Sequence, residues 1–156
     1  MLCATMLATA PGAAETLGPE TQRPLPRFVS MKAGEANVRR GPSLTHRVDW
    51  VFRHRGLPLM VTAEHGHWRR VRDREGIGGW IHYAMLSGAR TAVVVADMAE
   101  LRRQPDPDAP VTARAERDAV VRITRCGPQW CRVSAGSHRG WVGVGDLWGA
   151  TSPDAE

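Results

Sequence analysis

Two short segments, Trp68-Arg69-Arg70-Val71 and Gly79-Trp80-Ile81, decide the fold because both occur twice. They return in the same order as Trp130-Cys131-Arg132-Val133 and Gly140-Trp141-Val142. An earlier segment, Asn37-Val38-Arg39-Arg40-Gly41-Pro42, matches Glu100-Leu101-Arg102-Arg103-Gln104-Pro105, and Leu86 matches Leu147. All four matches lie about 62 residues apart. The sequence therefore predicts two tandem units of similar size.

Each unit has the pattern of a small β domain. Short runs rich in β-branched and aromatic residues, such as 48–52, 57–63 and 68–72, are separated by Gly- and Pro-containing turns. The second unit repeats this pattern over 119–125, 130–134 and 141–142. No stretch of eleven residues carries apolar side chains at helical spacing. The predicted fold class is all-β, as two tandem small β-barrels.

The order of these motifs resembles the bacterial Src homology 3 (SH3b) domain family. Residues Arg27–Arg90 carry the resemblance through Asn37-Val38-Arg39, Trp68-Arg69-Arg70-Val71 and Gly79-Trp80-Ile81. The second unit is more degenerate, because Glu100 replaces Asn37 and Gln104 replaces Gly41. The resemblance implies SH3-like barrels, an extracytoplasmic location and a non-catalytic binding or targeting role at the cell wall.

The domain organisation follows from the repeat and from the two ends. We expect residues 1–26 to be a signal peptide and linker, 27–90 the basic SH3-like domain 1, 91–150 the disulfide-containing SH3-like domain 2, and 151–156 a tail. Met1–Ala14 is small and apolar and ends in Ala-x-Ala-like triplets, which is typical of an export signal, although a positively charged start is missing. The alternative is an uncleaved tail. The sequence contains no run of eighteen apolar residues, so no transmembrane helix is predicted.

The chain has a formal net charge of +5, and the excess of positive charge lies in the first unit. Residues 27–90 hold twelve basic and five acidic side chains, whereas residues 91–156 hold eight and nine. This asymmetry favours an anionic partner for the first unit, and the alternative is scattered surface charge. Nucleic acid is a disfavoured partner, because the chain has only one Lys among its basic residues and a nucleic-acid binder more often mixes Lys with Arg.

Cys126 and Cys131 flank the turn Gly127-Pro128-Gln129-Trp130. A hairpin with this turn brings the two cysteines within reach of a disulfide, which needs an oxidising compartment. The spacing is poor for zinc and is not Cys-x-x-Cys. We predict a disulfide, with two free thiols as the alternative, and no metal site. Cys3 would leave with the signal peptide.

Candidate ligand-binding residues come from what the first unit has and the second lacks. Trp50 and Tyr83 have no aromatic counterpart in the second unit, so they are candidates for a binding groove. Four arginines of the first unit could bind carboxylates bidentately: Arg53, Arg55, Arg70 and Arg72. The repeated tryptophans Trp68, Trp80, Trp130 and Trp141 are interpreted first as packing anchors. His65 and His67 flank a predicted turn, where exposed polar residues are expected rather than metal ligands.

No catalytic or cofactor motif is recognised, so we predict neither an enzyme nor a cofactor. The leading hypothesis is a non-enzymatic exported protein, periplasmic or extracellular, that recognises peptidoglycan or another cell-envelope component. The first alternative is a periplasmic protein–protein adaptor that binds extended peptides in an aromatic groove. The second is a nucleic-acid binder that uses the basic first domain.

Overall fold

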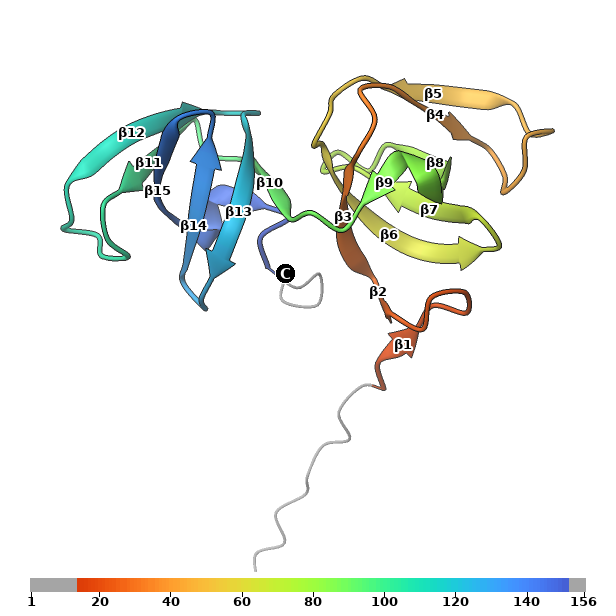
Figure 1. The fold of residues 1–156 in the computed structure, drawn as a ribbon, viewed down its shortest axis with the longest axis horizontal. Coiled ribbons are helices and arrows are strands. Elements are labelled where there is room, and N and C mark those ends of the chain that lie inside the picture. Colours follow the sequence, from red (N-terminus) through yellow and green to blue (C-terminus); the bar gives the residue numbers. More distant parts are fainter. Residues whose placement is uncertain (1–13, 152–156) are drawn as a thin grey trace, which may run out of the picture.

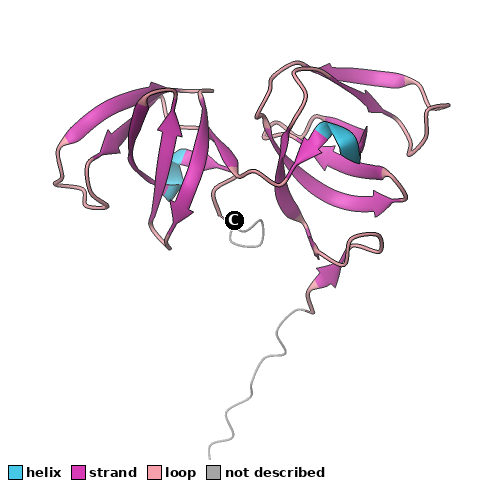
Figure 2. Cartoon of the chain, viewed as in Figure 1, coloured by secondary structure: helices cyan, strands magenta, loops and turns pink. Residues whose placement is uncertain are grey.

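A computed structural model describes residues 14–151 of the chain, and this part is nearly all β (Figures 1 and 2). It contains two seven-stranded antiparallel sheets, which confirms the prediction of two tandem small β domains. Most of the predicted signal peptide, including Cys3, and most of the predicted tail lie outside the described residues. No helix in the described part is long and apolar enough to span a membrane.

The first sheet contains the strands between Arg27 and Ser87. Their bounds are β3 (Arg27–Met31), β4 (Ala36–Arg39), β5 (Val48–Phe52), β6 (Pro58–His65), β7 (Trp68–Arg72), β8 (Gly78–His82) and β9 (Leu86–Ser87), with the 3₁₀ turn η1 (Tyr83–Met85) before β9. The strands pair in the order β5-β4-β8-β7-β6-β3-β9. Alternate residues, such as Val71 and Ile81, point into one buried apolar core, as the period of two in a strand requires.

The second sheet repeats the first, strand for strand. It comprises β10 (Thr91–Val94), β11 (Met98–Arg102), β12 (Val111–Glu116), β13 (Val120–Cys126), β14 (Trp130–Ala135), β15 (His138–Gly143), η2 (Val144–Asp146) and β16 (Leu147–Trp148). The order is β12-β11-β15-β14-β13-β10-β16. Arg39 pairs with Trp80 in the first sheet and Arg102 with Trp141 in the second, so the repeat in the sequence is also a repeat in register.

The sheets curve around their cores without closing into barrels. Phe52 on β5 and Leu86 beside β3 contribute to the same core, although β5 and β9 are the two ends of the strand order. Among residues 14–151, no strand pairing joins those two ends. The expected barrel is therefore a curved sheet with an open seam.

The two domains pack directly against each other through a small apolar interface. Trp148 is 7% exposed and meets the ring of Phe28 edge-on, at 4.9 Å between centroids, with Met60 and Val93 buried beside them. Thr91 Oγ1 donates a hydrogen bond of 2.7 Å to the Gly56 carbonyl across the same boundary. The two domains, which lie side by side in Figure 1, are therefore in direct contact and not merely joined by the connecting segment.

The segment expected as a linker is folded. Residues 16–25 form a two-stranded ribbon of β1 (Thr16–Leu17) and β2 (Pro24–Leu25) (Figure 1). A cis peptide bond joins Leu25 to Pro26. The turn of the ribbon is held by Glu64 of β6, whose carboxylate accepts hydrogen bonds from the N–H groups of Glu20 and Thr21 and from the Thr21 hydroxyl. A Cβ on Gly18 would collide with this carboxylate, so glycine permits the close approach.

Glu64 is a buried charge with a full set of partners. Its side chain is 0% exposed and pairs with Arg27 at 2.8 Å and with Arg69 at 3.6 Å. Burial alone would raise the pKa of Glu64, but the hydrogen bonds from Thr21, Arg27 and the Glu20 N–H outweigh burial and lower the pKa to about 2. The carboxylate therefore stays charged and joins the N-terminal ribbon to the first sheet.

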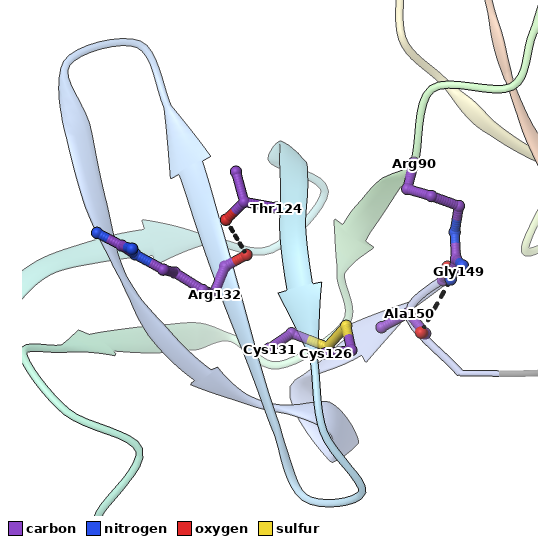
Figure 3. Close-up of a disulfide and its surroundings, with 7 residues drawn as sticks. All are labelled: Arg90, Thr124, Cys126, Cys131, Arg132, Gly149 and Ala150. Carbon is purple, nitrogen blue, oxygen red and sulfur yellow. Dashed lines mark hydrogen bonds between the residues drawn. A yellow bond between two sulfur atoms is a disulfide. The ribbon is translucent and has the colours of Figure 1, made fainter.

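The predicted disulfide is confirmed. Cys126 at the end of β13 faces Cys131 on β14, their Cα atoms lie 4.1 Å apart, and they are bonded (Figure 3). Cys131 is fully buried in the core of the second domain. In the same domain, Arg90 donates hydrogen bonds to the carbonyls of Gly149 and Ala150, which fastens the last strand of the domain to the residue before its first strand (Figure 3).

The disulfide should contribute measurably to stability. Replacing both cysteines, as Cys126→Ser with Cys131→Ala, should lower the free energy of unfolding by about 2 kcal/mol, because the unfolded chain gains the entropy of an open loop. Urea denaturation under non-reducing conditions measures the difference. Adding reductant to the wild type should reproduce it, and no change in either experiment would contradict the prediction.

Candidate functional site

The outer face of the β7–β8 hairpin gathers aromatic and basic side chains. Three cross-strand pairs lie on it, namely Trp68 with His82, Arg70 with Trp80, and Arg72 with Gly78. The intervening residues Val71 and Ile81 point into the core, so these three pairs point outward. We call these six residues the β7–β8 face.

The basic half of this face borders a cationic hollow of about 620 Å³. Its lining includes Arg70, Arg72 and Trp80 of the face, together with Arg39, Arg40, Asp49, Thr62 and the glycines that precede Trp80. Arg70 and Arg72 are exposed, and neither guanidinium forms an ion pair within residues 14–151. Two cations therefore face the hollow without a counter-ion from the described part of the protein.

Two glycines in the lining of this hollow allow the backbones of neighbouring strands to approach closely. A Cβ on Gly79 would lie 2.6 Å from the Arg39 carbonyl oxygen, and one on Gly78 would collide with the Val71 carbonyl. Since no side chain fits at either position, the backbones of β4, β7 and β8 approach closely here. The Gly78-Gly79-Trp80 sequence thus shapes the floor below Arg70 and Arg72.

The other arginines around the hollow have partners. Asp49 accepts hydrogen bonds from Arg47 at 2.6 Å and Arg40 at 3.0 Å, and these two bonds lower the pKa of Asp49 below its ordinary value. Arg39 donates to the carbonyls of Leu44 and His46 and so braces the loop after β4. Among the arginines that line the hollow, Arg70 and Arg72 are therefore the two whose guanidinium groups have no hydrogen-bond or ion-pair partner among the described residues.

A second, smaller hollow of about 250 Å³ adjoins the aromatic half of the face. Its apolar lining residues are Trp68, Met85, Ala36 and Leu44. We call its polar lining residues, Glu35, Asn37, Arg39 and His82, the rim. Arg39 lines both hollows. The two hollows therefore adjoin on one surface of the first domain.

The comparison with known families agrees with this architecture. The model of the bacterial SH3 domain matches the chain twice, over residues 32–88 and 95–149. This chain belongs to the bacterial SH3 domain family. The two matches correspond to the two sheets, so the chain carries a tandem pair of bacterial SH3 domains.

Two solved structures resemble the tandem SH3 chain at low identity. NlpC2 from Trichomonas vaginalis is 13% identical over 79% of this chain, with a TM-score of 0.37. NlpC1 from the same organism is 12% identical over 84% of this chain, with a TM-score of 0.36. The match spans 48% of the length of either structure. No curated protein matches the chain.

The six residues suggested from the sequence do not line one hollow of the first SH3 domain. Arg70 and Arg72 line the cationic hollow. Trp50 and Arg53 line a shallow depression on β5 that shares Asp49 with the cationic hollow, and Arg53 approaches Glu35 at 3.6 Å. Arg55 donates to the Lys32 carbonyl at 2.7 Å.

Tyr83 lines neither hollow, but it contacts His82, which lines the aromatic hollow. Its ring stacks on His82 at 4.9 Å and on His67 at 5.6 Å, as a half-exposed aromatic group at the start of η1. Trp50 and Tyr83 lie on different parts of the sheet: Trp50 is on an end strand, and Tyr83 follows β8. The lack of an aromatic counterpart in the second domain does not indicate how far apart the two residues lie.

The repeated tryptophans lie outside the buried cores of the SH3 domains. All four are half-buried, and none belongs to a core cluster. Trp68 and Trp80 line the two hollows of the first domain, whereas Trp130 and Trp141 line a hollow of about 380 Å³ beside the disulfide in the second. No role for Arg39 or the two glycines was inferred from the sequence, although the recurrence of Arg-Arg and of Gly-Trp at matching positions of the two repeats was the available signal.

The second SH3 domain keeps only part of the face. Arg132 and Trp141 pair as Arg70 and Trp80 do, but Ser134 stands where the first domain has Arg72, and Gly143 where it has His82. Arg102, the counterpart of Arg39, forms an ion pair with Glu100. The cationic hollow and the aromatic hollow are therefore features of the first domain.

Proposed function

We propose that this protein is an exported, non-enzymatic binding protein that recognises peptidoglycan, or another anionic component of the cell envelope, through its first SH3 domain. The observation that carries the proposal is the pair Arg70 and Arg72, which face the cationic hollow beside Trp80 without an ion pair among the described residues. The disulfide supports export, because such bonds persist in oxidising compartments.

The chemistry of the hollow suits carboxylates. A guanidinium presents its N–H groups in a planar fork that matches a carboxylate with two parallel hydrogen bonds. Arg70 and Arg72 are two residues apart on one strand, which places their Cα atoms about 7 Å apart. Carboxylates spaced along a short peptide, as in peptidoglycan stem peptides, fit that arrangement.

Removing both cations should weaken retention on the cell wall. In Arg70→Gln with Arg72→Gln, the protein pelleted with purified peptidoglycan sacculi should need at least roughly ten times more sacculi for half-retention, because each charge-assisted hydrogen bond contributes about 1.5–3 kcal/mol. The matched control is Arg122→Gln with Arg139→Gln, which removes the same charge from exposed positions of the second domain. The control should bind as the wild type does.

Three results would contradict this proposal. Absence of wild-type retention would exclude peptidoglycan as the ligand. An equal loss in the control variant would mean that net charge, and not the hollow, causes binding. Release of soluble fragments from the sacculi during incubation would show that the protein is an enzyme.

A further inference from the structure

We propose that the first SH3 domain reads two parts of one ligand, a sugar ring in the aromatic hollow and a carboxylate in the cationic hollow. The ligand class is a glycan unit that carries an anionic peptide. This inference rests on the proposed function and specifies its ligand. The observation behind it is that two hollows of different chemistry share Arg39 and adjoin along one hairpin face.

The aromatic hollow has the composition of a sugar site. Trp68 and Met85 belong to its apolar lining, and an indole ring has a flat apolar surface on which the C–H face of a pyranose ring can stack. Asn37, Glu35 and His82 stand at the rim, where their polar atoms can meet hydroxyl and acetamido groups. A purely apolar ligand in this hollow would leave the polar groups of the rim without hydrogen-bond partners.

The rim of the aromatic hollow is held in place before any ligand arrives. His82 Nδ1 accepts a hydrogen bond from the Ala84 N–H, which leaves Nε2 for a ligand. The ring of His82 meets Trp68 edge-on at 5.5 Å. Arg39 braces the carbonyl of Leu44, whose side chain lines the same hollow. Arg39 is thus a positioning residue at the boundary between the two hollows.

The spacing of the two hollows selects a composite ligand. Along β7, Trp68 and Arg70 are about 7 Å apart and Trp68 and Arg72 about 14 Å apart, from the rise of an extended strand. A monosaccharide alone would reach only the aromatic hollow, and a short anionic peptide would reach only the arginines. A sugar with a peptide attached spans both.

Three soluble probes test the inference on the full chain by isothermal titration calorimetry. They are N-acetylmuramyl-L-alanyl-D-isoglutamine, the free dipeptide in N-acetylated form (N-acetyl-L-alanyl-D-isoglutamine, which has the same charge as the muramyl peptide), and N-acetylglucosamine, which should bind more weakly than the muramyl peptide. The muramyl dipeptide should bind at least tenfold more tightly than the free dipeptide. In Trp68→Leu this ratio should fall to within twofold of one, while the affinity for the free dipeptide stays unchanged, because leucine keeps apolar volume without a flat ring.

Three further variants keep the test decisive. Trp130→Leu, the equivalent change in the second domain, should leave the ratio at its wild-type value. Arg72→Gln should weaken both peptides together, and thermal unfolding should show that each variant is folded. If Trp68→Leu does not fold, Asn37→Ala at the rim should lower the ratio instead.

The outcomes separate the inference from the proposed function. Retention on sacculi with equal affinity for the two peptides, or with no binding of either probe, overturns the two-part ligand and leaves cell-wall binding standing. Absence of retention on sacculi overturns the proposed function itself. A ratio that is unchanged in a folded Trp68→Leu protein also overturns the inference.

Discussion

Trp148→Ala is expected to lower the free energy of unfolding by about 3–5 kcal/mol, the usual cost of truncating a buried tryptophan. Trp148 is 7% exposed and packs on Phe28, Met60 and Val93, which belong to both domains. The variant should therefore also loosen the two domains from each other, because the apolar cluster around Trp148 joins residues of both. Urea denaturation measures the first effect, and ¹⁵N relaxation, as a shorter rotational correlation time for each domain, measures the second.

The control for Trp148 is another tryptophan of the same chain. Trp50 is 48% exposed on an end strand, so Trp50→Ala should change the free energy of unfolding by less than about 1 kcal/mol. Similar losses of unfolding free energy in the two variants would show that Trp148 at the domain interface contributes no more to stability than an exposed tryptophan. An unchanged correlation time in Trp148→Ala would mean that other contacts, such as the ion pair of Arg74 with Asp118, hold the domains together.

Glu64→Gln is expected to destabilise the protein by roughly 3–5 kcal/mol, because it breaks a buried ion pair from one side. Arg27 and Arg69 would remain buried without a counter-charge, and a neutral amide cannot accept all the hydrogen bonds from Glu20 and Thr21. The N-terminal ribbon should also detach. Denaturant unfolding reports the first effect, and faster proteolysis within residues 16–25 reports the second.

Acid should remove the same contribution from the wild type. Because the pKa of Glu64 is about 2 in the folded protein and near 4.5 in the unfolded chain, the unfolded state binds the proton first. The stability that the carboxylate provides, roughly 3 kcal/mol, is therefore complete above about pH 5 and is lost as the pH falls toward 2. In Glu64→Gln this part of the pH dependence should be missing.

Glu35→Gln is the matched control for both measurements. Glu35 and Arg53 form a surface pair at 3.6 Å, with both side chains more than 60% exposed, so its loss should cost less than about 1 kcal/mol. Acid sensitivity that persists unchanged in Glu64→Gln would assign the effect to other carboxylates and contradict the role given to Glu64.

The candidate site was only partly accessible from the sequence. Arg70 and Arg72 could be selected because alternation along one strand places them on one face, and that relation is local. Arg53, Arg55, Trp50 and Tyr83 could not be sorted in the same way, since their neighbours come from other strands. Whether an arginine is available to a ligand depends on partners such as Asp49 or the Lys32 carbonyl, which are set by strand pairing.

The sequence by itself determined the two units, their all-β class and the disulfide, because turn residues, alternation and a hairpin spacing act over a few residues. Only the tertiary structure decided that the expected linker folds onto Glu64 and that Trp148 joins the domains. It also decided that two adjoining hollows lie on the β7–β8 face. The physical reason is the same in each case: burial and charge pairing at these places join residues tens of positions apart, and no local pattern encodes such contacts.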